Sequence, residues 1–124
     1  MNELFLYTGS VIIIIWGIAH LISIKAIVDG FGEISSDNRK IITMETIAGG
    51  LTLCFLGILV IMVTLMGDWQ CRTASIVYFL AAIMLMLMAL LTLLTGAKTS
   101  LLPYKICPFV KMIAAILILL GIIL

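Results

Sequence analysis

The chain has 124 residues, of which 65% are hydrophobic and only 10% are charged, and its formal net charge is +1. A soluble domain is closer to half apolar and a quarter charged, so this composition excludes an ordinary soluble domain. The nearly neutral charge also gives no reason to expect a nucleic-acid partner. The length is typical of a single domain.

The apolar residues are gathered in four long blocks, which cover residues 4–24, 42–66, 73–95 and 104–124. A helix crosses a bilayer with about 20 apolar residues, so each block predicts a transmembrane helix. The acidic start and the length of the first block both argue against a cleaved signal peptide. We therefore predict an all-α integral membrane protein with one transmembrane domain, 1–124. Tyr7, Trp69 and Tyr104 lie near the predicted interfaces, where aromatic rings act as anchors.

The basic residues are unevenly distributed between the two ends of these blocks. Six of the seven lie at the first and third connections, namely Lys25, Arg39, Lys40, Lys98, Lys105 and Lys111. Arg72 lies at the second connection. Positively charged connections stay in the cytoplasm. We therefore expect a multi-pass protein of the plasma membrane with both termini outside.

Residues 25–41 form the longest connection, and their pattern is amphipathic. Apolar side chains fall on one helical stripe at Ile24, Ile27, Val28, Phe31 and Ile34. Charged side chains fall on the opposite stripe at Lys25, Asp29 and Glu33. The pattern predicts an amphipathic piece along the inner membrane surface. Because Gly30 and Gly32 weaken a helix, a mobile hydrophilic loop over 29–40 is the alternative.

Small residues recur every seven positions along the blocks, as at Gly50 and Gly57 in the second and Ala82 and Ala89 in the third. Helices associate inside lipid through close van der Waals approach, which small residues permit. A seven-residue period favours left-handed crossing. We therefore expect an up-down-up-down left-handed four-helix bundle. Its short connections should place the third helix beside the second and the fourth beside the third.

Few polar side chains are predicted at membrane depth, where charged groups are costly and usually face the interior of a bundle. His20, the only histidine, shares a helix face with Trp16. Glu45 in the second helix and Thr92 in the third lie at nearly the same depth. Lys111 should lie roughly 10 Å deep, because a helix that started after it would be too short to span the bilayer.

These side chains are expected to converge on one level in the cytoplasmic half of the bundle. We predict that His20 meets Glu45, with Lys111 as counter-charge, and that the neutral imidazole keeps one nitrogen free. A polar knot that fixes helix register, interfacial snorkelling and a functional pocket are the three interpretations. The candidate ligand-binding residues are His20, Glu45, Lys111, Thr92 and Trp16.

Cys54, Cys71 and Cys107 lack CxxC spacing, and no pair of them looks bridgeable in this topology. They are interpreted as small core residues, although Cys71 is a candidate for oxidation or for pairing between chains. The sequence contains no P-loop, GxSxG or HExxH motif. A single histidine ligates heme from both sides only if two chains meet. No cofactor, metal or catalytic residue is therefore assigned.

Two short patterns carry a family resemblance. G-x-x-H at the end of the first helix (Gly17, His20) precedes E-x-x-x-G-G at the entry to the second (Glu45, Gly49, Gly50). In these residues the chain resembles the DoxX-like group of small four-helix membrane proteins, over roughly half its length. The resemblance implies a four-helix bundle. Some members of this group are linked to quinone-coupled oxidoreductase complexes. The resemblance implies no catalytic residues.

We expect a small membrane protein with a cytoplasm-facing polar pocket that binds or transports a proton, an ion or a lipid-like small molecule. One alternative is a structural accessory subunit of a larger membrane complex. The other is a membrane enzyme or redox protein acting on a lipid or quinone, with His20 as the acid or base. Besides the lipid bilayer, the expected partners are further copies of the chain or other subunits of such a complex.

Overall fold

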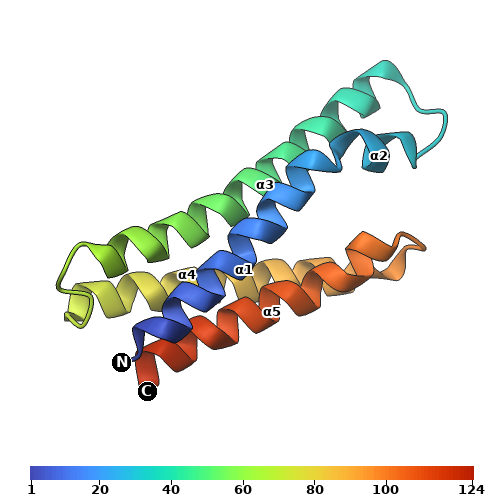
Figure 1. Cartoon of the computed structure of the whole chain (residues 1–124). Helices are drawn as coiled ribbons and strands as arrows, with labels where there is room; N and C mark the ends of the chain where they lie inside the picture. The colour runs from blue at the N-terminus through green and yellow to red at the C-terminus, as the bar shows by residue number, and fades with distance from the viewer.

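The computed structural model describes residues 1–124, and every regular element is helical (Figure 1). The four long helices are α1 (Glu3–Ile22), α3 (Ser36–Leu65), α4 (Arg72–Leu94) and α5 (Leu102–Ile123). The short elements are α2 (Ile24–Asp29) and a 3-10 turn, η1 (Gly96–Lys98). Each long helix is long and apolar enough to cross a membrane. The predictions of an all-α fold and of four long apolar helices are therefore confirmed.

The start of α3 is the one helix boundary that the apolar pattern misplaced. The second block predicted a start at residue 42, whereas α3 begins at Ser36. The Ser35 side chain accepts a hydrogen bond from the Asn38 backbone N–H at 3.1 Å, and Asp37 lies in the first turn. Both features favour a helix N-terminus. Hydropathy misses these turns because they are polar, so part of the predicted loop 25–41 is helical.

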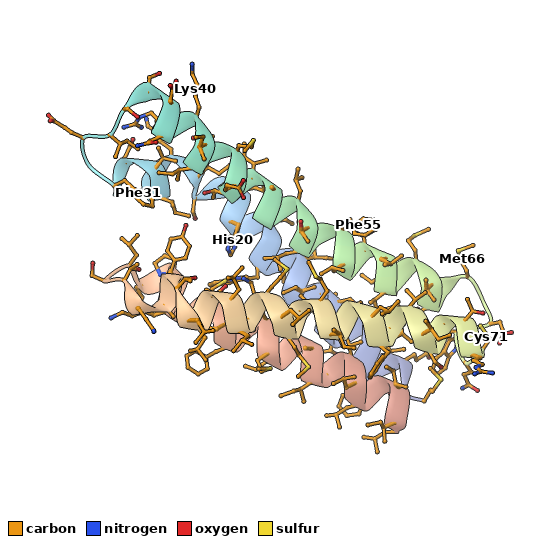
Figure 2. All side chains as sticks on the ribbon, turned by 180° about the vertical axis from the view of Figure 1, so that it is seen from behind. His20, Phe31, Lys40, Phe55, Met66 and Cys71 are labelled. Carbon is orange, nitrogen blue, oxygen red and sulfur yellow. The ribbon has the colours of Figure 1, made fainter.

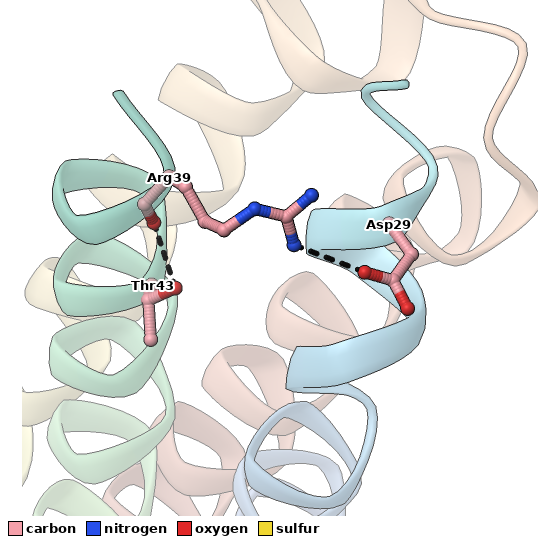
Figure 3. Close-up of polar contacts among 3 residues, drawn as sticks. All are labelled: Asp29, Arg39 and Thr43. Carbon is pink, nitrogen blue, oxygen red and sulfur yellow. Dashed lines mark hydrogen bonds and ion pairs between the residues drawn. The ribbon is translucent and has the colours of Figure 1, made fainter. Parts of the chain in front are cut away.

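The amphipathic piece predicted after the first helix is present but short. It is α2, in which Ile27 and Val28 are buried. The helix ends at Asp29, and Gly32 has a φ of 73°, a conformation that suits glycine. An ion pair of 3.0 Å between Arg39 and Asp29 ties α2 to the first turns of α3 (Figure 3). The chain therefore folds back on itself at this connection.

The long helices alternate in direction, and the two termini lie at the same end of the bundle (Figure 1). There the Asn2 backbone N–H donates to the Gly121 carbonyl at 2.7 Å. We call this the terminal end. The opposite end holds α2, η1 and the basic residues Lys25, Arg39, Lys40, Lys98 and Lys105, and we call it the basic end.

Helix α1 is the central helix, because it packs along both α3 and α5. A Cβ atom added to Gly57 would lie 2.8 Å from the Ser10 carbonyl, and one added to Gly17 would lie 2.9 Å from the Gly50 carbonyl. Backbones approach this closely only where side chains are absent or small. The prediction that Gly50 and Gly57 face a neighbouring helix is confirmed, and that neighbour is α1.

The predicted pairing of the second and third helices is only partly right. Helices α3 and α4 meet next to their short connection, where the hydroxyls of Thr64 and Tyr78 lie 3.1 Å apart. Toward the basic end the two helices diverge (Figure 1). A short connection constrains only the ends that it joins, and the glycine contacts hold α3 against α1 instead. Helix α5 does pack along α4, as predicted.

Candidate functional site

His20 lies in the last turn of α1, and both nitrogens of its ring have partners. Nδ1 lies 3.0 Å from the Trp16 carbonyl oxygen. A carbonyl can only accept a hydrogen bond, so Nδ1 carries the proton of the neutral ring and Nε2 is the acceptor. The partner of Nε2 is the sulfur of Cys107 on α5, at 3.7 Å.

Cys107 and Trp16 complete a closed cycle of hydrogen bonds between α1 and α5. The indole Nε1–H of Trp16 donates to the Cys107 sulfur at 3.2 Å. The thiol then donates to His20 Nε2, and His20 Nδ1 donates back to the Trp16 carbonyl. The Trp16 and His20 rings are also in contact, edge to face, with centroids 5.6 Å apart. We call these three residues the thiol cluster.

Lys111 lies one helical turn after Cys107, on the same face of α5. Only 5% of its surface is exposed, and Nζ donates to the Thr92 hydroxyl of α4 at 2.9 Å. Thr92 in turn donates to the Met88 carbonyl at 2.8 Å. The Cys107 thiol is also within electrostatic reach of the ammonium group. Lys111 therefore points into the bundle, and it does not snorkel out of it.

The predicted meeting of His20, Glu45 and Lys111 is not formed. The one ion pair between side chains joins Arg39 to Asp29. His20 is held by Trp16 and Cys107, and Lys111 is held by Thr92. Glu45 is exposed near the basic end and has no ion-pair partner.

Two clefts flank His20 at the basic end. The first, of about 230 Å³, lies between α1, α2 and the start of α5, and it is lined by Trp16, Ala19, His20, Ser23, Ile27, Leu102, Pro103, Tyr104 and Ile106. The second, of about 300 Å³, lies between α1, α3 and α5, and it is lined by His20, Ile41, Ile42, Glu45, Thr46, Gly49 and Tyr104. His20 and Tyr104 belong to both, so they form the partition between them. Figure 2 shows His20 where α3 stands away from the helices opposite it.

The clefts combine apolar walls with a few polar groups. Ala19, Ile27 and Leu102 supply apolar surface in the first cleft, and Ser23 lines it as a polar residue. The Tyr104 hydroxyl lies against Thr46, which lines the second cleft. Pro108 lies within α5 and has no N–H to donate to the Tyr104 carbonyl one turn earlier. Ligand sites commonly combine an apolar lining with a small number of polar groups.

The structure thus divides the five predicted site residues into three groups. Trp16 and His20 are joined through Cys107, Lys111 is joined to Thr92, and Glu45 faces His20 only across the second cleft. Cys107 and Tyr104 were missed as site residues. The sequence did contain one indication for Cys107, which precedes Lys111 by four residues, and Lys111 was predicted at membrane depth. Tyr104 had been assigned an anchoring role only.

Four helices of this length and apolarity indicate a multi-pass membrane protein, and its basic end carries the clefts and the thiol cluster. Searches against family models, curated proteins and solved structures found no match to the chain.

Proposed function

We propose that this protein is a small multi-pass protein of the plasma membrane that binds a lipid-like amphipathic molecule at its basic end. The observation that carries the proposal is the position of His20 and Tyr104 between two largely apolar clefts. Apolar walls accommodate a hydrocarbon chain, and a few polar groups orient its head. The second cleft, of about 300 Å³, reaches the lower end of the range of about 300–1,000 Å³ that small-molecule sites occupy, and the first, of about 230 Å³, adjoins it across the partition.

The proposed orientation follows from the basic residues. The basic end gathers Lys25, Arg39, Lys40, Lys98 and Lys105, whereas Arg72 lies at the other end. This bias supports a cytoplasmic basic end, with both termini outside. The clefts then open near the inner leaflet, where a lipid-like molecule enters between helices without crossing the bilayer.

The state of His20 favours a lipid-like ligand over an ion. An ion carrier would use a free imidazole nitrogen, and here one nitrogen binds the Trp16 carbonyl while the other binds Cys107. Ser23 lines the first cleft, and the Tyr104 hydroxyl lies against Thr46 of the second cleft, so each cleft offers a hydroxyl to a polar head group. We therefore place the head group at Ser23, Tyr104 and the edge of the His20 ring.

Trp16 provides a direct optical test of this site. The chain has two tryptophans, so Trp69→Phe leaves Trp16 as the only one. A dibrominated fatty acid added to this variant in detergent should quench the Trp16 emission with a saturable dependence on its mole fraction. Trp16→Phe, which retains Trp69 at the other end of the bundle, should show only a linear, non-saturating response.

His20→Ala in the Trp69→Phe background measures how much His20, one of the two residues between the clefts, contributes to ligand affinity. We expect the half-saturation point to rise at least about fivefold, which corresponds to roughly 1 kcal/mol. The methyl ester of the same acid tests the head group and should bind more weakly. A linear response of Trp16 in the parent protein would contradict the proposed site.

A further inference from the structure

We propose that Cys107 is a nucleophilic thiol that adds to α,β-unsaturated carbonyl compounds of lipid character arriving from the first cleft. This inference extends the proposed function from reversible to covalent binding, and it rests on that function only for the route to the sulfur. It also gives the thiol cluster a chemical role that the amphipathic ligand alone does not require.

The first argument is the convergence of hydrogen-bonding groups on one sulfur atom. The Trp16 indole donates to the sulfur at 3.2 Å, and His20 Nε2 lies 3.7 Å away as an acceptor for the thiol proton. Once that proton has moved to Nε2, both groups donate to the sulfur. Since the thiolate is the reactive form of cysteine, these donors stabilise the nucleophile.

The second, independent argument is the buried charge of Lys111. Its ammonium group has three N–H bonds, and the Thr92 hydroxyl accepts one of them at 2.9 Å. No carboxylate pairs with it, because the one side-chain ion pair lies between Asp29 and Arg39. A buried cation is costly without a counter-charge. The Cys107 thiol, one turn away on the same helix face, supplies that charge when it ionises.

The reaction is an addition that retains every atom of both reactants. The thiol proton moves to His20 Nε2, and the sulfur forms a bond to the β-carbon of the electrophile. The π electron pair of the carbon–carbon double bond moves toward the carbonyl and forms an enolate, whose negative charge the Lys111 ammonium stabilises. His20 then returns the proton to the α-carbon. No oxidant is consumed, and no group leaves.

The surroundings of Cys107 select a lipid-like electrophile. Only 1% of the residue is exposed, and the rings of Trp16 and His20 cover its sulfur. Both rings also line the first cleft, beside the apolar side chains of Ile27 and Leu102. Cys107 lies behind these two rings and does not itself line the cleft, so an electrophile must pass between them to reach the sulfur.

The test compares maleimides, which are α,β-unsaturated carbonyl compounds, on the full chain in lipid vesicles. N-ethylmaleimide crosses membranes, and mass spectrometry of peptides gives a separate alkylation rate for Cys107 and for Cys54. We expect Lys111→Met to slow the alkylation of Cys107 about tenfold relative to Cys54, because the reactive thiolate loses the nearby cation that stabilises it. Lys111→Arg, which keeps the charge, should restore most of the rate.

Lys98→Met is the matched control, because it removes a charge from the basic end at an exposed position. It should leave the rate at Cys107 unchanged. Equal rates in the parent and Lys111→Met would overturn the proposal, as would a Cys107 that stays unlabelled when Cys54 is fully alkylated. If circular dichroism shows that Lys111→Met does not fold, Trp16→Phe takes its place in the test. We expect this variant to slow the alkylation of Cys107 several-fold, and an unchanged rate would overturn the proposal.

A second pair of reagents separates the thiol chemistry from the cleft. N-dodecylmaleimide carries a long apolar chain, and we expect its preference for Cys107 over Cys54 to exceed that of N-ethylmaleimide by several-fold. Equal preferences would overturn the lipid-like electrophile and the route through the cleft. The effect of Lys111→Met on N-ethylmaleimide would still report on the thiol cluster by itself.

Discussion

Lys111 and Glu45 are predicted at similar depths, but the fold places them in different surroundings. Lys111 is buried against Thr92, whereas Glu45 is exposed and has no ion-pair partner. Depth follows from counting residues along a helix, at 1.5 Å per residue. The rotation of each helix about its axis decides which neighbour a side chain meets, and that rotation depends on contacts with other chain segments.

Removal of the Thr92 hydroxyl should destabilise the bundle. Thr92→Val retains the shape of the side chain but leaves the Lys111 ammonium without its hydroxyl acceptor. Since hydrogen bonds to charged groups contribute roughly 1.5–3 kcal/mol, we expect a loss of about 2 kcal/mol in the free energy of unfolding. Unfolding in sodium dodecyl sulfate, followed by circular dichroism, measures this loss.

Glu45→Gln is the companion variant to Thr92→Val. Because Glu45 is exposed, the free energy of unfolding of Glu45→Gln should stay within about 0.5 kcal/mol of that of the parent protein. A polar knot centred on Glu45 would give the opposite ranking of the two variants. That result would restore the pairing with His20 that the structure does not form.

At the scale of the helices, contact between α1 and α3 is the feature that shapes the bundle. Gly17 on α1 meets Gly50 on α3, and Gly57 on α3 meets the backbone of Ser10. Gly9 lies against the Ala114 carbonyl of α5 on another face of α1. Helix α1 therefore holds α3 on one face and α5 on another, and the second cleft lies at the basic end, where α3 diverges from α4.

Gly57→Leu should force α1 and α3 apart. A Cβ atom at this position would already lie 2.5 Å from the Ile14 side chain and 2.8 Å from the Ser10 carbonyl. Overpacking of this kind typically costs about 1–3 kcal/mol. The same detergent unfolding experiment should show a loss in that range for the variant.

Gly49→Leu is the matched control on the same helix. A Cβ atom at Gly49 would have no neighbour within 4 Å, so the larger side chain meets open space. Its stability should stay close to that of the parent protein. Equal stability of Gly57→Leu and the parent would show that α3 does not pack on α1 through its glycines.

At the scale of the whole molecule, the two ends differ in charge, and each has a cysteine in or near it. Figure 2 shows Lys40 at one end and Cys71 at the other. Cys107 lies near the basic end, next to the clefts. Membership of an oligomer or of a larger complex stays a prediction, as does the resemblance to the DoxX-like group, because both depend on surfaces or relatives outside this chain.

The orientation can be measured with the native Cys71, which lies at the terminal end and is partly exposed. A membrane-impermeant maleimide applied to intact cells should label Cys71, because the basic end is expected in the cytoplasm and the terminal end outside. Permeabilised cells provide the control for reagent access. Labelling of Cys71 only after permeabilisation would reverse the proposed topology.

The sequence by itself determined the all-α class and the number of long apolar helices. These properties follow from local composition, since an apolar run of sufficient length must form a helix in lipid. The charge of each connection can likewise be counted from its own residues. The sequence also identified Gly50 and Gly57 as contact residues. The spacing of these glycines shows which face of their own helix they share. It can be read without knowing which helix packs against that face.

Only the tertiary structure decided which polar groups meet. The thiol cluster joins residues 91 positions apart, and the partner of Lys111 lies 19 positions away on another helix. Such contacts depend on the order of helices around the bundle and on their rotations, which the close approach of α1 to α3 sets. His20 therefore meets Cys107 and not Glu45, because the glycine contacts hold α3 against another face of α1 while α5 brings its thiol to the imidazole.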